Sequence, residues 1–320
     1  FKIVNDVSKG IKIELLEYVE GTMINMFYDN KWKIATRSNI GCDIRFNHDV
    51  ELTFRDMFLE AFTNKGLEFD MFSKKYSYSF VLQHPKNRIV VPFNKTNIIL
   101  TNVYECNGLN VKEVDIKNKS LWISETNEHL IETPKNIETV LNIENATIDS
   151  VANIIGKGVD YTIQGAVILC RYMGVRTKIR NQNYENVRIL KGNSPKLQYQ
   201  YYNLRQYDRV KEFLKFYPEY GEKFSNLREQ LHKWTNNLRQ NYIDCYVKKT
   251  KPLKEYPFEF RTHMFNLHKI YLNELRSEGL YINKPRVIKY INNLPPDHLM
   301  CSINYPLKIA KINEKKNEMI

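Results

Sequence analysis

Apolar residues recur at two different spacings, and the dominant spacing changes between the first and second parts of the chain. In the first part apolar and polar residues mostly alternate, which is typical of half-buried strands. After Pro195 the apolar residues recur every three or four positions, which is typical of amphipathic helices. The pattern predicts strands over 11–15, 22–28, 32–36, 77–82, 88–92, 97–104, 161–169 and 174–179. It predicts helices over 51–64, 137–141, 148–155, 204–216, 224–246, 260–276 and 286–292.

This order of elements predicts two domains. Strands and short helices mixed along residues 1–195 indicate an α+β domain, and residues 196–320 indicate an all-helical domain, with the change of character over 195–203. Asp29-Asn30, between two alternating segments, is a hairpin-turn signal, and Gly66 ends the helix predicted over 51–64.

Composition narrows the class of protein. Of the 320 residues 42 % are hydrophobic and 26 % charged, so the chain is neither disordered nor fibrous. It has no apolar run of membrane-spanning length and no secretory signal, and its five cysteines include no C-x-x-C pair. We therefore expect a cytoplasmic or otherwise intracellular protein with no membrane partner. The chain begins at Phe1 rather than Met, which is consistent with residues missing upstream.

Positive charge is concentrated in the second half. The net charge is +12; residues 171–320 hold 29 Lys and Arg against 14 Asp and Glu, whereas residues 1–170 hold 19 against 22. Such asymmetry favours a polyanion-binding part, with nucleic acid as the expected partner. A composition biased toward Lys, Asn and Ile for other reasons is the alternative.

Three segments carry a shared pattern because their order and spacing agree with one another. They are 18–22 (YVEGT), 78–81 (YSFV) with 84–91 (HPKNRIVV), and 163–168 (IQGAVI) with 174–180 (GVRTKIR). Together they resemble the covalent nucleotidyltransferases, in particular the adenylyltransferase domain of the phage-type RNA ligases, over residues 11–192. The resemblance implies a ligase-like fold of antiparallel sheets with helices for the first domain.

The same resemblance implies catalytic positions, and several of them carry altered residues. In the family a K-x-D-G turn carries the lysine that accepts AMP; here its nucleophile position holds Tyr18 and its acidic position Glu20. The carboxylates of two further motifs are replaced by Ser79 and Gln164. In the family a lysine amine attacks the α-phosphorus of ATP, and a tyrosine at this position does not supply that amine. We therefore expect a pseudoenzyme, impaired in forming lysine–AMP. Lysines that could substitute from nearby are Lys9, Lys12, Lys31 and Lys33.

Nucleotide-binding positions also follow from the resemblance. They are Gly21, Arg37, Phe80, Arg88, Gln164, Lys178 and Arg180. Phe80 would stack on the purine or pack in a core, and Arg88 would bind ligand or form a surface pair. Lys178 and Arg180 share one strand face, as two phosphate contacts require, although a solvated strand edge shows the same pattern. ATP and Mg²⁺ are the expected cofactors if the protein is active.

A basic and aromatic segment over 184–204 is the expected nucleic-acid surface. Cations contact phosphates and aromatic faces stack on bases, so this mixture suits single-stranded RNA or DNA, with RNA favoured. Packing of its tyrosines at the domain junction is the alternative. The residues are Arg188, Lys191, Lys196, Tyr199, Tyr201 and Tyr202. A second cluster of lysines, over 248–251 with Lys254, is a solvated loop or a phosphate contact.

Other chemistry is not indicated. The seven histidines lack a Cys or acidic neighbour at metal-ligand spacing, so no metal site is expected, and neither common phosphate-loop motif is present. Three functions stay open: a nucleotide- or RNA-binding protein related to ligases, an active ATP-dependent RNA ligase with a displaced lysine, and a structural subunit of a nucleic-acid-processing assembly. Protein partners would then dock on the helical domain.

Overall fold

The structure of the chain, a computed structural model, describes residues 13–46, 51–170, 174–194 and 196–317. Residues 11 and 12 of the first expected strand, with Lys9 and Lys12, lie outside the described residues. The chain forms two compact units, Phe1–Lys191 and Gly192–Ile320. The expected class is confirmed, because an α+β unit with antiparallel sheets precedes a helical one.

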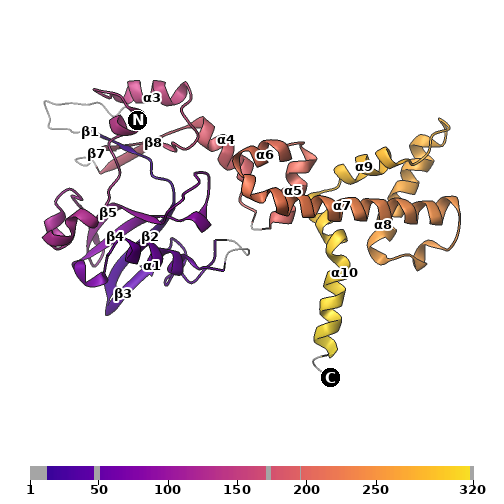
Figure 1. Cartoon of the computed structure of the whole chain (residues 1–320), viewed down its shortest axis with the longest axis horizontal. Helices are drawn as coiled ribbons and strands as arrows, with labels where there is room; N and C mark the ends of the chain where they lie inside the picture. The colour runs from indigo at the N-terminus through magenta and orange to yellow at the C-terminus, as the bar shows by residue number, and fades with distance from the viewer. Residues whose placement is uncertain (1–12, 47–50, 171–173, 195, 318–320) are drawn as a thin grey trace. The chain divides into compact units, whose positions relative to one another are not determined.

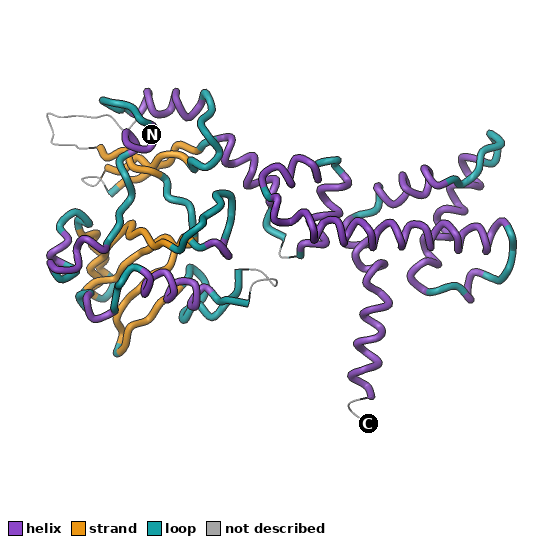
Figure 2. Tube along the Cα trace, viewed as in Figure 1, coloured by secondary structure: helices purple, strands orange, loops and turns teal. Residues whose placement is uncertain are grey.

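Two antiparallel sheets make up the described part of the first unit (Figures 1 and 2). The smaller has the order β1-β7-β8 and the larger the order β3-β2-β4-β5-β6. The chain therefore crosses from one sheet to the other directly after β1. The strands are β1 (Ile13–Glu17), β2 (Thr22–Asp29), β3 (Lys31–Ala35), β4 (Tyr76–Gln83), β5 (Asn97–Asn107), β6 (Asn110–Val114), β7 (Gly165–Cys170) and β8 (Val175–Arg180).

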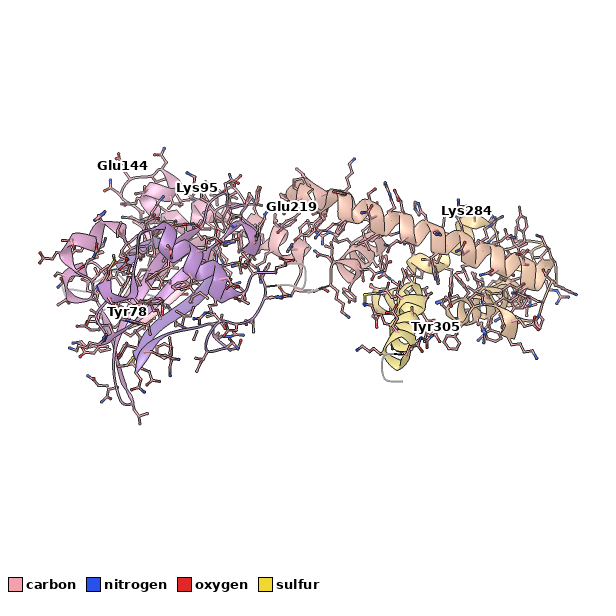
Figure 3. All side chains as sticks on the ribbon, turned by 60° about the horizontal axis from the view of Figure 1, so that its bottom comes forward. Tyr78, Lys95, Glu144, Glu219, Lys284 and Tyr305 are labelled. Atoms are coloured by element: carbon pink, nitrogen blue, oxygen red, sulfur yellow. The ribbon has the colours of Figure 1, made fainter. Side chains whose placement is uncertain are left out.

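The larger sheet packs against helix α1 (Phe54–Asn64). Thr53 caps the helix, because its hydroxyl accepts from the Asp56 amide while the Asp56 carboxylate accepts from the Thr53 amide. The helix buries an apolar face on alternate residues of β2 and β4, and Figure 3 shows one of them, Tyr78, inside this unit. The fully buried residues of these two strands are Ile24, Met26, Tyr78, Phe80 and Leu82.

A second, small core covers one face of the smaller sheet. Helices α2 (Ile137–Leu141) and α3 (Ile148–Gly156) bury Ile137, Val151 and Ile155 against Ala166 of β7. Figure 1 shows α3 next to this sheet. Because the helices cover this face, the opposite face of β1, β7 and β8 is left to line a cavity.

The strand predicted over 88–92 is wrong. Residues Pro85–Asn87 form a short 3₁₀ turn, η3, and the chain then bends instead of joining a sheet. The amides of Val90 and Val91 donate to the buried carboxylate of Glu20, at 2.8 and 3.0 Å, so they are not available to a strand ladder.

The regular elements of the second unit, among its described residues, are all helices, and none of the described helices is long and apolar enough to cross a lipid bilayer. The single helix predicted over 204–216 is wrong, because Asp208 adopts a left-handed conformation (φ 55°) and separates two helices. A C-terminal helix, α10, was not predicted. The helices, with α4 of the first unit, are α4 (Gln182–Lys191), α5 (Leu197–Gln206), α6 (Val210–Phe216), α7 (Gly221–Tyr242), α8 (Phe258–Ile270), α9 (Lys284–Asn292) and α10 (Pro296–Asn317).

Short turns complete the described elements. Two are π-helical and continue α7 and α8. These are η7 (Ile243–Val247) and η9 (Tyr271–Leu275), and the 3₁₀ turns are η2 (Phe69–Met71), η3, η4 (Lys119–Leu121), η5 (Glu125–Leu130), η6 (Pro218–Tyr220) and η8 (Leu253–Glu255).

A buried histidine connects three helices of the second unit. His263 of α8 lies with Nδ1 2.9 Å from the Tyr290 hydroxyl and Nε2 2.8 Å from the Ser302 hydroxyl. Ser302 already donates to the carbonyl of His298, so its oxygen accepts from Nε2–H, and Tyr290 donates to Nδ1. The network therefore requires a neutral imidazole. Burial lowers the pKa of His263, and the neighbouring His298 lowers it further.

This network predicts a pH-dependent stability of the helical unit. Because the folded-state pKa of His263 is lowered, its contribution is complete above the ordinary value of 6.5 and is lost as pH falls below it. We expect His263→Gln to cost about 1–3 kcal/mol at pH 8, because a buried partner loses its hydrogen bond. The variant should also lose less stability than the wild type between pH 7 and 5. Urea unfolding across this range measures both effects.

The control is His232→Gln, since His232 lies exposed on α7. It should keep the wild-type pH profile. An unchanged profile for His263→Gln would show that the network does not govern the acid response.

Candidate functional site

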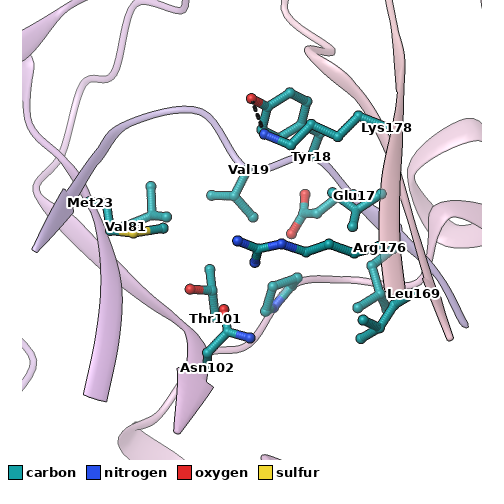
Figure 4. Close-up of a pocket in the computed structure, with 13 residues that line it drawn as sticks. Glu17, Tyr18, Val19, Met23, Val81, Thr101, Asn102, Leu169, Arg176 and Lys178 are labelled. Atoms are coloured by element: carbon teal, nitrogen blue, oxygen red, sulfur yellow. Dashed lines mark hydrogen bonds between the residues drawn. The ribbon is translucent and has the colours of Figure 1, made fainter. Parts of the chain in front are cut away.

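A cavity of about 130 Å³ lies between the two sheets of the first unit. Its lining combines an aromatic ring, two cations and one carboxylate with apolar residues of both sheets (Figure 4). The lining residues are Leu16, Glu17, Tyr18, Val19, Met23, Val81, Thr101, Asn102, Pro134, Val167, Leu169, Arg176 and Lys178.

Tyr18 stands where the chain leaves the smaller sheet. Its amide donates to the carbonyl of Gly165 at 3.0 Å, which extends the pairing of β1 with β7 by one residue. Three residues later the chain enters the larger sheet through Gly21, where a Cβ would lie 2.3 Å from the carbonyl oxygen of Leu82. Only glycine allows this close approach, so Gly21 holds the crossing in place and does not line the cavity.

Lys178 of β8 meets Tyr18 across the smaller sheet. Its Nζ donates to the Tyr18 hydroxyl at 2.6 Å and lies 4.0 Å from the centre of the Tyr18 ring (Figure 4). The tyrosine thus engages the ammonium through both its oxygen and its π face. Two of the expected residues, Tyr18 and Lys178, are therefore brought together at one end of the cavity.

Arg176 is a cation of the cavity that was not predicted from the sequence. It lies two residues before Lys178 on the same face of β8, and its guanidinium extends toward Thr101 and Asn102 of the larger sheet (Figure 4). Burial raises the pKa of Tyr104 on β5, and the positive charge of the Arg176 guanidinium offsets part of this rise. The charge of Arg176 therefore affects a side chain of the larger sheet. The period of two along β8 was the signal that could have identified it.

A β-bulge in β5 places two polar side chains in the wall of the cavity. Ser79 of β4 pairs with Asn102 while Phe80 pairs with Leu100, which leaves Thr101 as an extra residue. The bulge shifts the alternation, so Leu100 and Val103 both face the core, whereas Thr101 and Asn102 both line the cavity. This shift has no simple sequence signal.

Carboxylates are scarce in the cavity. Glu17 is the acidic residue of the lining, and its Oε1 already accepts from the Lys135 amide at 2.8 Å. Ser79, at one of the altered motif positions, donates to the side-chain oxygen of Asn25 at 2.7 Å. Within the described residues no group of three His, Cys, Asp or Glu could hold a metal ion. The cavity therefore does not supply a carboxylate set for Mg²⁺.

Glu20, expected as a catalytic residue, instead ties segments together. Its carboxylate is buried, accepts from the amides of Val90 and Val91, and does not line the cavity. Burial raises the pKa of Glu20, while bonds from both amides and from the Tyr184 side chain, with the charge of Arg88, offset part of the rise. Glu20 thus positions the turn that carries Tyr18.

The remaining expected nucleotide contacts do not converge on the cavity. The stacking role expected for Phe80 is corrected: its ring is buried in the core, 5.8 Å from Phe58, and cannot reach a base. Arg37 is exposed beyond β3, and Arg88 donates to the Val90 carbonyl. Gln164 lies just before β7, outside the lining, with its side-chain oxygen buried and unpaired.

Of the lysines proposed as displaced nucleophiles, the two that the structure describes do not line the cavity. Lys31 and Lys33 lie on β3, and Lys33 pairs with Asp29 at 2.5 Å. Lys9 and Lys12 lie outside the described residues.

The expected nucleic-acid segment is largely engaged in internal contacts. Arg180 and Arg188 both bind the carboxylate of Glu185, at 3.2 and 2.6 Å. The expected role of Tyr201 is corrected, because it is buried on α5 and packs 5.1 Å from Phe224; the neighbouring Tyr202 is buried as well. Lys196 is exposed, and Arg188, Lys191 and Tyr199 are half-buried.

Comparison with known proteins supports the ligase resemblance locally. No protein-family model matches the chain. The chain is 31 % identical over 101 residues to an RNA ligase of Rhodothermus phage RM378, a match that covers 29 % of this chain and 23 % of that protein. The resemblance indicated by the motifs is confirmed at this level.

Solved structures of ligases are less similar to this chain in sequence. An RNA ligase of Naegleria gruberi, solved with ATP and Mn, is 12 % identical, with a TM-score of 0.38 over 55 % of this chain and 52 % of that one. A putative ATP-dependent DNA ligase from Aquifex aeolicus is also 12 % identical, with a TM-score of 0.37 over 84 % and 64 %. The chain thus spans about a quarter of the phage ligase and about half of the Naegleria enzyme.

The role of Glu20 can be tested by its removal. We expect Glu20→Ala to lower the free energy of unfolding of the first unit by about 3 kcal/mol, because the buried amides of Val90 and Val91 lose their acceptor. Glu125→Ala, at an exposed position, is the matched control and should change stability by less than about 0.5 kcal/mol. Denaturant unfolding compares them, and equal stability of the two variants would exclude the positioning role.

Proposed function

We propose that the cavity between the sheets binds a nucleotide through its phosphates, and that the chain is an RNA-ligase-like protein impaired in forming lysine–AMP. The observation that carries the proposal is the contact of Lys178 with Tyr18, because Tyr18 occupies the position that the resemblance assigns to the nucleophilic lysine. Arg176 adds a second cation to the same cavity. ATP is the nucleotide that the ligase resemblance implies.

The chemistry of the lining favours binding over group transfer. Arg176 and Lys178 can donate to phosphate oxygens, and such charge-assisted hydrogen bonds are stronger than neutral ones. An ammonium that donates to the Tyr18 hydroxyl has no lone pair with which to attack phosphorus. With Glu17 engaged by Lys135, the cavity also offers no carboxylate cluster to a metal ion.

An active nucleotidyltransferase is the second candidate. The position of Lys178 favours this second candidate, because its side chain lines the cavity and contacts Tyr18, which occupies the position of the family's nucleophilic lysine. Transfer would require Lys178 to lose its proton and to leave Tyr18.

Nucleic acid, with RNA first, is the proposed macromolecular partner. The second unit holds 23 Lys and Arg against 13 Asp and Glu, and the phage protein similar to part of this chain is an RNA ligase. A docking role for the helical unit in a larger assembly is the alternative, and affinity that falls steeply with salt distinguishes polynucleotide binding from it.

Nucleotide binding and covalent transfer can be measured on the same protein. We expect ATP binding by titration calorimetry, weakened about 10- to 100-fold in Lys178→Ala by loss of a charge-assisted contact. Lys31→Ala, on β3 and outside the cavity, is the matched control and should bind like the wild type. After incubation with α-labelled ATP or GTP and Mg²⁺ or Mn²⁺, we expect no label to stay on the denatured chain.

Two results would contradict this proposal in different ways. A label retained through denaturing electrophoresis, and lost in Lys178→Ala, would establish the active enzyme. ATP affinity equal in wild type and Lys178→Ala would remove the cavity as the nucleotide site.

A further inference from the structure

Three aromatic rings stack at one end of the helical unit. The ring centres of Tyr246 and His268 are 3.9 Å apart with an angle of 12° between the planes, and those of His268 and Tyr271 are 5.8 Å apart at 26°. All three side chains are half-buried, so each keeps accessible surface. The buried ring of Tyr242 supports the group 5.4 Å from Tyr246. We refer to Tyr246, His268 and Tyr271 as the aromatic stack.

The stack depends on two π-helical turns. Tyr246 lies in η7, which continues α7, and Tyr271 lies in η9, which continues α8. A π turn inserts an extra residue into a helical turn, is rare, and is frequently found at functional sites. Here one such turn at the end of each helix delivers a tyrosine to the same histidine.

Lysines follow the stack directly. Lys248 pairs with Asp244 at 3.0 Å, and Lys251 lies over the ring of Tyr256 at 4.5 Å. Lys249 and Lys254 are exposed. The segment 248–254, here called the lysine loop, therefore begins two residues after Tyr246 and carries four lysines.

Lys249 adopts a conformation that a lysine rarely adopts. Its φ is +55°, at the second residue after η7, where a helix end favours glycine. A left-handed conformation at a non-glycine residue costs free energy, and such residues are often found at functional sites. Lys249 is therefore tested separately from the stack.

We infer that the aromatic stack and the lysine loop form a binding surface for single-stranded polynucleotide. A base extends the stack on an exposed ring face, while the lysines contact the adjacent phosphates. A duplex suits this surface less, because its bases are already stacked on one another. The surface uses no residue of the cavity, so it is a second site and does not rest on nucleotide binding there.

Fluorescence anisotropy of the full chain with labelled 12-mers of U and dT tests the surface. We expect Tyr246→Ala and Tyr271→Ala to bind between about fivefold and a hundredfold more weakly, and Tyr246→Phe to restore affinity because the ring is kept. Tyr207→Ala is the matched control, since Tyr207 is exposed at the break between α5 and α6. It should bind like the wild type.

Substitutions of Lys249 distinguish a role in binding from a purely structural role. Lys249→Gly removes the strain and the charge together, so it should raise the melting temperature yet weaken binding. Lys249→Gln should reduce the slope of log affinity against log salt by about 0.7, the value for one phosphate contact on a single strand. Asp208→Gly relieves the same kind of strain elsewhere and should raise the melting temperature without weakening binding.

The outcomes separate the two sites. Equal affinity for RNA and DNA supports recognition of bases and phosphates alone, and preference for RNA supports an added contact to the 2′-hydroxyl. Tighter binding of a 12-base-pair duplex, displacement by polyglutamate as effective as by oligonucleotide, or wild-type affinity in both tyrosine variants would overturn the inference. ATP binding should be unchanged in every variant of the stack, so its loss or absence bears only on the cavity.

Discussion

The buried carboxylate of Glu20 connects three segments that are distant in sequence. A charged group removed from water must be hydrogen-bonded, and Glu20 takes the two consecutive amides of Val90 and Val91. The Tyr184 side chain of α4 donates to it as well. The turn after β1 is thereby fixed between the loop that follows β4 and the helix that ends the first unit. The position of Tyr18, two residues away, follows from this attachment.

Neighbouring side chains distinguish the cations that line the cavity from those that form ion pairs elsewhere. Lys178 and Arg180 lie two residues apart on one face of β8 and look equivalent in the sequence. Arg180 shares the carboxylate of Glu185 with Arg188, whereas Lys178 and Arg176 line the cavity. One glutamate on α4 thus pairs with two of the cations that were expected to contact phosphates. Such competition is set by tertiary structure, and net charge does not reveal it.

The sequence was a good guide to elements and a weaker guide to the site. The alternation on β2 and β4 and the helical spacing on α1 identified their core faces because burial of apolar surface dominates there. The same alternation misassigned 88–92, where a carboxylate 70 positions away in the chain takes the amides. Phe80 and Tyr201 were aromatic residues in suggestive motifs, and both proved to be core. The bulge at Thr101, which decides which side chains of β5 face the cavity, depends on register and has no local signature.

Tyr18 and Lys178 form a close pair at the position that the ligase resemblance assigns to a lysine. A lysine at position 18 would bring a second ammonium to the place where the Tyr18 oxygen now lies 2.6 Å from Nζ of Lys178. Two like charges at such a distance repel strongly, the more so in a partly buried cavity. Tyrosine replaces that repulsion by a hydrogen bond and a cation–π contact. The contact between the two residues therefore depends on a tyrosine at position 18, and a lysine there would remove both the hydrogen bond and the cation–π contact.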